Sequence, residues 1–511
     1  MGALVVAVPQ VASAEARTVA PPSTVWTPPA TVNHTPTGGQ PPTAAWLPGY
    51  KPGFAAAAVS SCGANETGLL PQYPLERFQI SDRMEALVNT HDGNLTITQR
   101  QLTIKGTGEN LSLSQVYNNQ RAGNGSFGTG WTLSHGQDIG LTFNGSDVVL
   151  HGDSGYCATF AHQADGTYTE APGVHAELSK ASDGKYSLIF DSSNERWTFS
   201  PAGWLLSQAD RSGNTVTPRY NIDGTTASIT DSQGRVTSFG YTNGLVSAIT
   251  DPTGTAAATY TYNTTGQLTD FTDRSGASMH LTWWPSGDLN TIQDPNGKTY
   301  TFTYDTSHRV SKVSIPRQAG AADTTFGYGS GQTTETDPNS HSVTYHYDTQ
   351  GRQTSAVDAL GHEQKTEWTT NSDVQTTVDG LNNSTTNTYD PLNNLIGTQL
   401  PTGAKTSVGY TDTTHPHLPT TVTGPARGQD LLHLRRGRQR QDHPLRRAQR
   451  RSAVPDVLPA LGPGRHQHRR QRARHQLRLR QRRQPQNRHS AHAAGHHQLH
   501  LRLALAGRVG H

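Results

Sequence analysis

A unit of about 21 residues repeats from Asp210 to about Gly424, and this period constrains the fold more than any other feature of the chain. Each unit opens with Asp, and an aromatic residue follows about ten residues later. The opening residues are Asp210, Asp231, Asp251, Asp273, Asp294, Asp337, Asp358 and Asp379. The aromatic residues are Tyr220, Tyr241, Tyr262, Trp283, Tyr304, Tyr347, Trp368 and Tyr389. A fixed period of this length predicts a repeat architecture in which each unit packs mainly on its neighbours.

The residues within one unit predict a β-hairpin. Asp294 and Gly297 occupy the first and fourth places of a type I turn. The same pairing recurs at Asp231–Gly234 and Asp358–Gly361. The run from Tyr300 to Tyr304 then alternates, so its aromatic residues share one face of a strand. A second turn follows, at residues that tolerate a left-handed backbone: Gly224, Gly287, Gly351 or Asn394.

The predicted fold class is all-β, with tandem hairpins forming a curved or spiral sheet that an irregular β capping domain precedes. The array is expected over 206–424 and the irregular β domain over 66–205. The unit between Pro316 and Asp337 departs from the pattern, and we expect a loop insertion at Gln318–Asp323. Both termini are expected to be disordered. A single hairpin is marginally stable, so stability is expected to be collective.

Two phrases carry a resemblance to a known family. Tyr260-Thr-Tyr262-Asn263-Thr-Thr-Gly266-Gln-Leu268 and Tyr345-His-Tyr347-Asp348-Thr-Gln-Gly351-Arg resemble the YD repeat of Rhs proteins. The resemblance covers roughly residues 75–424. It implies a hollow β-shell, which in bacteria commonly encloses a C-terminal toxin domain that is released by a cut near Asp-Pro-x-Gly-Leu. This chain lacks that motif and a recognisable toxin, so the processing residues of the family cannot be carried over.

The region before the array also resembles Rhs proteins. Val116–Gln120 and Phe127–Ser134 are similar to the Tyr-Asn-Ser…Gly-x-Gly-Trp segment near the start of Rhs shells. The resemblance implies a cap that begins the spiral and protects its first edge from foreign strands. For Tyr117 and Trp131 themselves we expect core packing.

The N-terminal residues predict export. Residues 1–17 contain a short apolar run followed by Ala12-Ser13-Ala14, which is typical of a secretory cleavage site. An Ala-rich disordered terminus is the alternative interpretation. A Pro-rich linker follows over 18–65. The chain is therefore expected to be secreted or on the cell surface, and no run is long enough for a transmembrane segment. Cys62 and Cys157 are the two cysteines, and an even count permits one disulfide.

The tail over 425–511 differs abruptly from the rest. It carries 21 Arg against three acidic residues, or +18, while the remainder carries 21 basic and 36 acidic residues, or −15. A basic arm for nucleic acid is one interpretation. We favour an out-of-frame translation of further repeats, because shifted codons for Leu431–Pro444 can encode Ser-Tyr-Thr-Tyr-Asp and the spacing of Leu434, Leu479 and Leu501 keeps the period. Such a tail is expected to be disordered or spuriously helical, and no nucleic-acid partner is expected.

We predict no catalytic, cofactor-binding or metal-binding residue. Gly152-Asp153-Ser154-Gly155 matches the segment around a serine-protease nucleophile, but a polar β-turn is the simpler interpretation. His362-Glu363 begins like a zinc-protease helix without the second His. Metal binding by His497 and His500 in the tail would be adventitious. The Asp residues of the array are expected to cap their own turns rather than bind Ca²⁺.

The predicted function is therefore a non-catalytic exported Rhs/YD-repeat protein, the N-terminal fragment of a toxin shell without its C-terminal effector. The alternative is a wall-associated or carbohydrate-binding surface protein, with a cell-wall glycan rather than a missing toxin domain as its partner. The aromatic residues that can stack on sugar rings, or hold neighbouring strands together, are Tyr241, Tyr262, Trp283, Tyr304, Tyr347, Trp368 and Tyr389.

Overall fold

A computed structural model of the chain describes residues 66–106, 110–121, 123–318, 320–424 and 431–433. In these ranges the regular structure is β apart from one 3-10 turn, η1 (Gly136–Asp138). Within the same ranges, no helix has the length and apolar character needed to cross a bilayer. The predicted signal, Pro-rich linker and most of the Arg-rich tail lie outside the described residues.

The N-terminal region forms three small antiparallel sheets. The first contains β1 (Leu75–Gln79), β2 (Met84–Asn89), β3 (Leu95–Ile104), β4 (Leu111–Asn118) and β7 (Trp131–Leu133). The second contains β8 (Gly140–Asn144), β9 (Asp147–His151) and β10 (Cys157–Phe160). The third is the pair β5 (Asn124–Gly125) and β6 (Gly128–Thr129).

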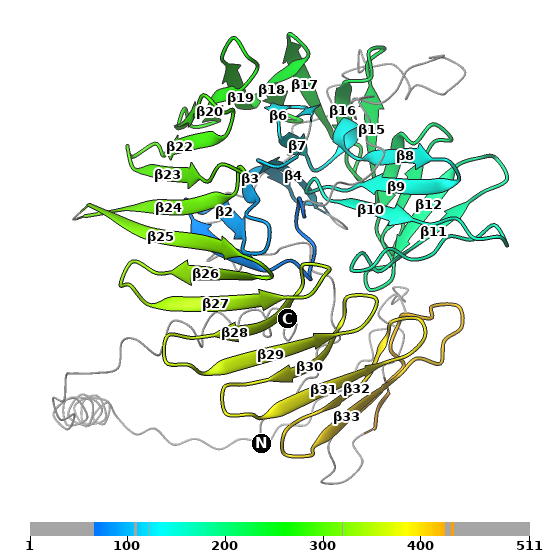
Figure 1. Cartoon of the computed structure of the whole chain (residues 1–511). Coiled ribbons are helices and arrows are strands. Elements are labelled where there is room, and N and C mark those ends of the chain that lie inside the picture. Colours follow the sequence, from blue (N-terminus) through cyan, green and yellow to red (C-terminus); the bar gives the residue numbers. More distant parts are fainter. Residues whose placement is uncertain (1–65, 107–109, 122, 319, 425–430, 434–511) are drawn as a thin grey trace, which may run out of the picture. The chain divides into compact units, whose positions relative to one another are not determined.

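The remaining strands form one sheet of 25 strands, in which every strand pairs antiparallel with its neighbours in sequence. Figure 1 shows much of this order from β17 to β33. The first members are β11 (Ala176–Lys180), β12 (Tyr186–Phe190), β13 (Arg196–Phe199), β14 (Leu205–Ala209), β15 (Thr215–Tyr220), β16 (Thr226–Thr230), β17 (Val236–Thr242), β18 (Leu245–Thr250), β19 (Ala256–Tyr262), β20 (Leu268–Asp273), β21 (Ser278–Trp283) and β22 (Leu289–Gln293). The later members are β23 (Thr299–Tyr304), β24 (Val310–Arg317), β25 (Gly320–Gly329), β26 (Gln332–Thr336), β27 (Ser342–Tyr347), β28 (Gln353–Val357), β29 (Glu363–Trp368), β30 (Val374–Val378), β31 (Ser384–Tyr389), β32 (Leu395–Gln399), β33 (Lys405–Gly409), β34 (Thr421–Thr423) and β35 (Leu431–His433). The predicted all-β class of tandem hairpins is confirmed.

The two ends of this sheet lie beyond the repeat pattern. It begins at β11, whereas the Asp-x-x-Gly pattern indicates an array only from residue 206. At the other end, β35 pairs with β34 through Val422 and Leu432. This strand falls in the stretch for which we expected no regular β-structure, and it forms where the edge of β34 offers unpaired backbone groups.

The irregular unit has a different shape from the one predicted. We expected a loop insertion at Gln318–Asp323, but β24 and β25 remain paired as far as Arg317 and Gly320. Asp323 itself pairs with Ser314 inside the ladder. The extra residues therefore lengthen two strands, because pairing their backbone groups costs less than leaving a long unpaired loop.

The N-terminal five-stranded sheet packs on a face of the repeat sheet. One apolar core joins residues of β1–β4 and β7 to residues of β15–β25, and Figure 1 shows these N-terminal strands beside the array. Tyr117 and Trp131 lie in this core, as predicted. An irregular β domain precedes the array, as predicted, and its strands β11–β13 extend the repeat sheet ahead of the first repeat. Its five-stranded sheet, in addition, covers apolar surface on the face of the array.

The inner face of the array changes character along the sheet. In β23 the inward residues Tyr300 and Phe302 are buried. In β29 the equivalent residues are Gln364 and Thr366, and both are partly exposed. We call β15–β25 the apolar stretch and β29–β33 the polar stretch. Within the strands of the polar stretch, Val408 alone is buried.

Candidate functional site

The opening Asp of each unit closes its own turn. The Asp294 Oδ1 accepts the backbone N–H groups of Asn296 at 2.8 Å and Lys298 at 2.9 Å, while Gly297 has a φ of 78°. The same bonds occur at Asp231 and Asp358, where Gly234 and Gly361 have φ of 76° and 84°. A carboxylate that caps two N–H groups has its acceptor capacity directed at its own backbone.

The second turn of the hairpin is built in the same way, which was not predicted. Asp348 and Asn263 each accept backbone N–H groups two and four residues later. In the unit where we expected Asn394 to be left-handed, Asn393 has the φ of 61°. Asn394 instead donates to Asp390 at 2.9 Å. The signal was present in most units as an Asp or Asn three residues before the left-handed residue, although Trp284 holds this place before Gly287.

The aromatic residue of each unit links it to the preceding hairpin. Its ring ends in a donor that bonds to a backbone carbonyl about fifteen residues earlier, at the start of the previous return strand. These bonds are Tyr241 to Thr226 (2.8 Å), Tyr262 to Val246 (2.7 Å), Trp283 to Leu268 (2.8 Å), Tyr304 to Leu289 (2.8 Å), Trp368 to Gln353 (2.8 Å) and Tyr389 to Val374 (2.9 Å). Tyr220, Tyr328 and Tyr410 make equivalent bonds, although none of the three was predicted as a site residue. We call each such bond a rung.

A β-bulge precedes most of the rungs, although the Tyr328 rung lies in a regular part of the ladder. The pairing register shifts immediately before the aromatic residue, for example between Thr303 and Tyr304 and between Glu367 and Trp368. A bulge adds local twist and turns a side chain away from the regular alternation. Burial raises the pKa of the Tyr304 and Tyr241 hydroxyls well above the usual value, so they remain donors at all physiological pH values.

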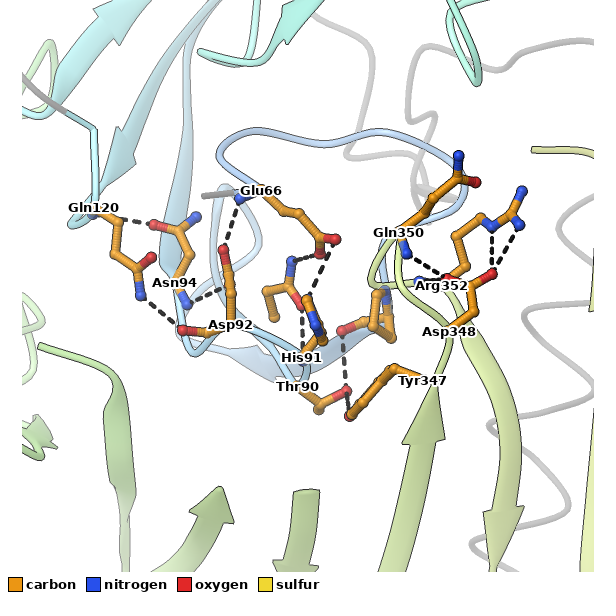
Figure 2. A network of polar contacts seen from close by, with 12 residues as sticks. Glu66, Thr90, His91, Asp92, Asn94, Gln120, Tyr347, Asp348, Gln350 and Arg352 are labelled. Carbon is orange, nitrogen blue, oxygen red and sulfur yellow. Dashed lines mark hydrogen bonds and ion pairs between the residues drawn. The ribbon is translucent and has the colours of Figure 1, made fainter. Parts of the chain in front are cut away.

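Tyr347 departs from this pattern because it reaches the N-terminal sheet. Its hydroxyl bonds to the Thr90 Oγ1 at 2.9 Å. Figure 2 shows the surrounding network. The Glu66 carboxylate lies 3.3 Å from His91 Nδ1, and the backbone N–H of Glu66 donates to the Asp92 carboxylate at 2.7 Å. Burial raises the pKa of Asp92 to about 7. This network fastens the N-terminal region to the array just before the polar stretch begins.

Gly351 is required for that fastening. It has a φ of 74°, and a Cβ built on it would overlap the Glu66 carboxylate and come within 2.6 Å of the His91 ring. The close approach of the turn at Asp348 to the N-terminal sheet thus depends on a residue without a side chain.

A shallow groove lies beside the Trp283 rung. Its volume is about 530 Å³, within the range of small-molecule sites, and its lining includes Asn263, Gln267, Thr282, Trp283 and Trp284. Trp284 is 38 % exposed, and its Nε1 donates to the Phe302 carbonyl at 2.9 Å. Trp283 was predicted as a site residue and Trp284 was not, although the doubled Trp was a visible signal.

A cluster of histidines and carboxylates joins distant segments. Ligand atoms of Glu170, His175 and Asp191 lie within 4.8 Å of one another. Burial and the neighbouring Glu170 raise the pKa of Asp191 to about 8. Burial alone would lower the pKa of His175, but the carboxylates of Glu170 and Asp373 raise it. No metal residue was predicted, since Glu170, His175 and Asp191 do not follow a known metal-ligand spacing and Asp373 is remote from them in sequence.

The other segments with suggestive sequences have plain structural roles. Gly152–Gly155 is a turn closed by a 3.1 Å backbone bond, and the buried Ser154 hydroxyl accepts the Leu69 N–H. His362 pairs with Asp358 next to a strand rather than on a helix. The Cys157 Sγ lies 3.7 Å from His151 Nδ1. Cys62, His497 and His500 lie outside the described residues.

The stacked hairpins and their Tyr/Asp/Gly units match a known family model. The teneurin YD-shell model matches residues 246–480. By this match, the array region belongs to the Rhs/YD-repeat family. A domain of unknown function, DUF6531, matches residues 86–160 of this YD-repeat chain, which include most of the N-terminal five-stranded sheet.

Curated relatives match the YD-repeat chain over a short part of their length. The tRNA nuclease WapA of Bacillus subtilis (strain 168) is 28 % identical over 151 residues, which cover 29 % of this chain and 6 % of that protein. The tRNA3(Ser)-specific nuclease WapA of Bacillus spizizenii has the same identity and coverage. The chain therefore spans a small fraction of the relatives that it matches.

Solved structures of toxin complexes are similar at low identity. A TcdB2–TccC3–Cdc42 structure matches with a TM-score of 0.33 and 11 % identity, over 65 % of this chain and 21 % of that one. A Tc holotoxin pore of Photorhabdus luminescens matches with a TM-score of 0.29 and 11 % identity, over 69 % and 26 % of the two chains.

Proposed function

We propose that this chain is a non-catalytic scaffold, the N-terminal part of an exported YD-repeat shell whose C-terminal effector lies outside the chain. The observation that carries this proposal is the change along the inner face of the array. The apolar stretch is buried against the chain's own N-terminal sheet, whereas the polar stretch presents Gln364, Thr366 and Asn387 as partly exposed side chains. A surface of this kind suits a hydrated guest or a further polar layer rather than a packed core.

We attribute the nuclease activity in the names of the WapA relatives to parts of those proteins that this chain does not match. The match covers 6 % of the relative, and the strands of the described residues form antiparallel sheets. We expect the purified chain to leave tRNA intact, as followed on a denaturing gel. Cleavage that co-purifies with the chain and disappears in a site-directed variant would overturn the non-catalytic assignment.

The chain is proposed to be interrupted by a frameshift near residues 424–431. The support is the +18 charge of the tail and the period of Leu434, Leu479 and Leu501 in the other frame. The test is the nucleotide sequence around codon 427, read in three frames, where another frame should continue the Tyr-x-Tyr-Asp unit. An absence of that unit from both other frames would contradict the fragment proposal.

A repaired gene would test the shell role directly. With the frame restored, we expect limited proteolysis of the product to leave one large resistant core that includes the downstream residues. Rapid digestion of everything after residue 424 would argue against a shell that continues past this point.

Export is proposed from the Ala12-Ser13-Ala14 site. Fusion of residues 1–65 to a reporter enzyme should deliver it to the culture medium, with cleavage after Ala14. A replacement of Ala12 and Ala14 by Leu is the matched control, because it should block the cleavage and leave the apolar run intact. Retention of the uncleaved reporter inside the cell would remove this part of the proposal.

Carbohydrate binding is a second candidate, which the exposed Trp284 in its groove favours. A glycan array probed with the whole chain should then show binding that Trp284→Ala removes. Trp368→Ala is the control, because it removes a similar ring from outside the groove. Binding to no glycan would leave the scaffold as the sole proposal.

A further inference from the structure

We propose that Glu170, His175 and Asp191 bind a divalent transition-metal ion of the Zn²⁺ class, and that this ion clasps the start of the repeat sheet to its polar stretch. The three residues precede β11, or follow β12, at the edge of the sheet. Their ligand atoms all lie within 4.8 Å of one another. Imidazole nitrogens and carboxylate oxygens are both ligands of Zn²⁺, three protein ligands leave a position open, and the imidazole disfavours Ca²⁺ and Mg²⁺.

The spacing of the first two ligands fits a metal better than it fits a hydrogen bond. Glu170 Oε1 lies 3.3 Å from His175 Nδ1, and this oxygen is buried without a hydrogen bond among the described residues. Two ligands of a tetrahedral ion with bonds of about 2.0–2.1 Å are about 3.3 Å apart, whereas N–H···O bonds are mostly about 2.9–3.0 Å.

The outer partners of the ligands are those that metal sites use. His175 Nε2, on the far side of the ring, lies 3.5 Å from Asp373 Oδ1. A carboxylate on the second ring nitrogen fixes the tautomer and orientation of a ligating His. The other Glu170 oxygen, Oε2, accepts the Asn393 side-chain amide at 2.6 Å. Asp373 and Asn393 are thus positioning residues, and both belong to the polar stretch.

A histidine of the array, outside the group of three, borders Asp191. His417 Nε2 is 3.6 Å from Asp191 Oδ1, and this nitrogen is also buried without a hydrogen bond in the described part of the chain. In the described part of the chain, Glu170 forms an ion pair with His175 and Asp191 forms one with His417, and both histidines are cationic only when protonated. A bound dication would balance the two carboxylates while both imidazoles stay neutral.

The consequence is a link between segments that are remote in sequence. Residues 170–191 would be joined to Asp373 and His417, where the array lacks a buried apolar face. A metal bond would therefore stabilise the part of the sheet that hydrophobic packing leaves weakest.

The test is Zn²⁺ binding by the full chain, measured by isothermal titration calorimetry together with the melting temperature. Zn²⁺ should raise the melting temperature, and Ca²⁺ and Mg²⁺ should not. His175→Ala should weaken the Kd at this site at least tenfold and abolish the thermal shift. Glu170→Gln, which keeps the shape and the Asn393 bond, should do the same if His175→Ala fails to fold. Asp373→Asn should weaken the Kd about tenfold through the orientation of His175.

Two controls separate this site from other histidines. His280→Ala removes an exposed His that pairs with Asp270 alone, so its Zn²⁺ response should equal that of the parent. A double replacement of His497 and His500 by Asn should lower the Zn²⁺ stoichiometry without changing the thermal shift. The proposal is overturned if the cluster variants keep the parent thermal shift, or if Zn²⁺ binds the parent chain without raising its melting temperature.

Discussion

The apolar stretch β15–β25 and the polar stretch β29–β33 are made of the same hairpin unit, yet they bury very different surfaces. In the apolar stretch, Phe302, Ile292 and Leu289 are fully buried against the N-terminal sheet. In the polar stretch, the equivalent positions hold polar or partly exposed residues such as Thr366 and Thr377. Both stretches keep the same Asp turns and aromatic rungs. The turns and rungs therefore define the hairpin, whereas the residues of the inner face differ according to whether the N-terminal sheet covers them.

The largest expected contrast is between inner-face residues. Phe302→Ala should lower the free energy of unfolding by about 3–5 kcal/mol, because it opens a cavity between two sheets. Thr366→Ala in the polar stretch should change it by less than about 0.5 kcal/mol. Urea denaturation followed by circular dichroism measures both. Equal effects would mean that the two stretches do not differ in packing.

The second contrast is in pH dependence. Burial and the neighbouring Glu335 raise the pKa of Glu76, in β1, from 4.5 to about 8. The folded state keeps a proton that the unfolded state loses, so this stability is present below about pH 4.5 and is lost as the pH rises towards 8. Glu76→Gln should reduce the loss of unfolding free energy between pH 4.5 and 8 by about 1–3 kcal/mol. This value is smaller than the full pKa shift implies, because Glu76 is partly exposed and solvent screens its charge.

A glutamate in the polar stretch provides the control. The side chain of Lys365 lowers the pKa of Glu363, which is exposed, so Glu363→Gln should leave the profile between pH 4.5 and 8 unchanged. Melting temperatures over this range measure both variants. A flat profile in the parent chain would refute the assignment to Glu76.

The third contrast is in the rungs. Tyr304→Phe removes a donor and leaves the Leu289 carbonyl without it beside the core, which should cost about 1–2 kcal/mol. Tyr389→Phe in the polar stretch should cost about 0.5 kcal/mol, because water can replace the lost bond at Val374. The denaturation midpoints of the two variants give the comparison. A larger loss for Tyr389→Phe would mean that burial does not set the strength of a rung.

The smallest expected difference is in the turns. Asp294→Ala and Asp358→Ala should each cost about 0.5–1 kcal/mol, since each loses two bonds to its own backbone. Asp294→Asn should be close to neutral, as Asn263 already fills this role in another turn. Thermal denaturation again measures the change. A much larger loss of stability for one of these two Asp→Ala variants than for the other would show that the turns depend on the packing around them.

Much of the unit was predictable from the sequence, and most of the contacts between distant segments were not. The Asp turn, the strand pair and the aromatic position follow from residues within one period. The second Asx turn was missed because only its left-handed residue was considered, and that residue was assigned to Asn394 instead of Asn393. The bond from Tyr347 to Thr90 could not be predicted, because it joins residues 257 positions apart.

The sequence alone determined the hairpin unit, because its interactions are local: an Asp bonds N–H groups two and four residues later, and a ring bonds a carbonyl about fifteen residues earlier. Only the tertiary structure decided that the N-terminal sheet lies on the face of the array, and that Glu170, His175 and Asp191 meet near Asp373. Those contacts depend on the path of many intervening strands, and no spacing within a 21-residue period encodes that path.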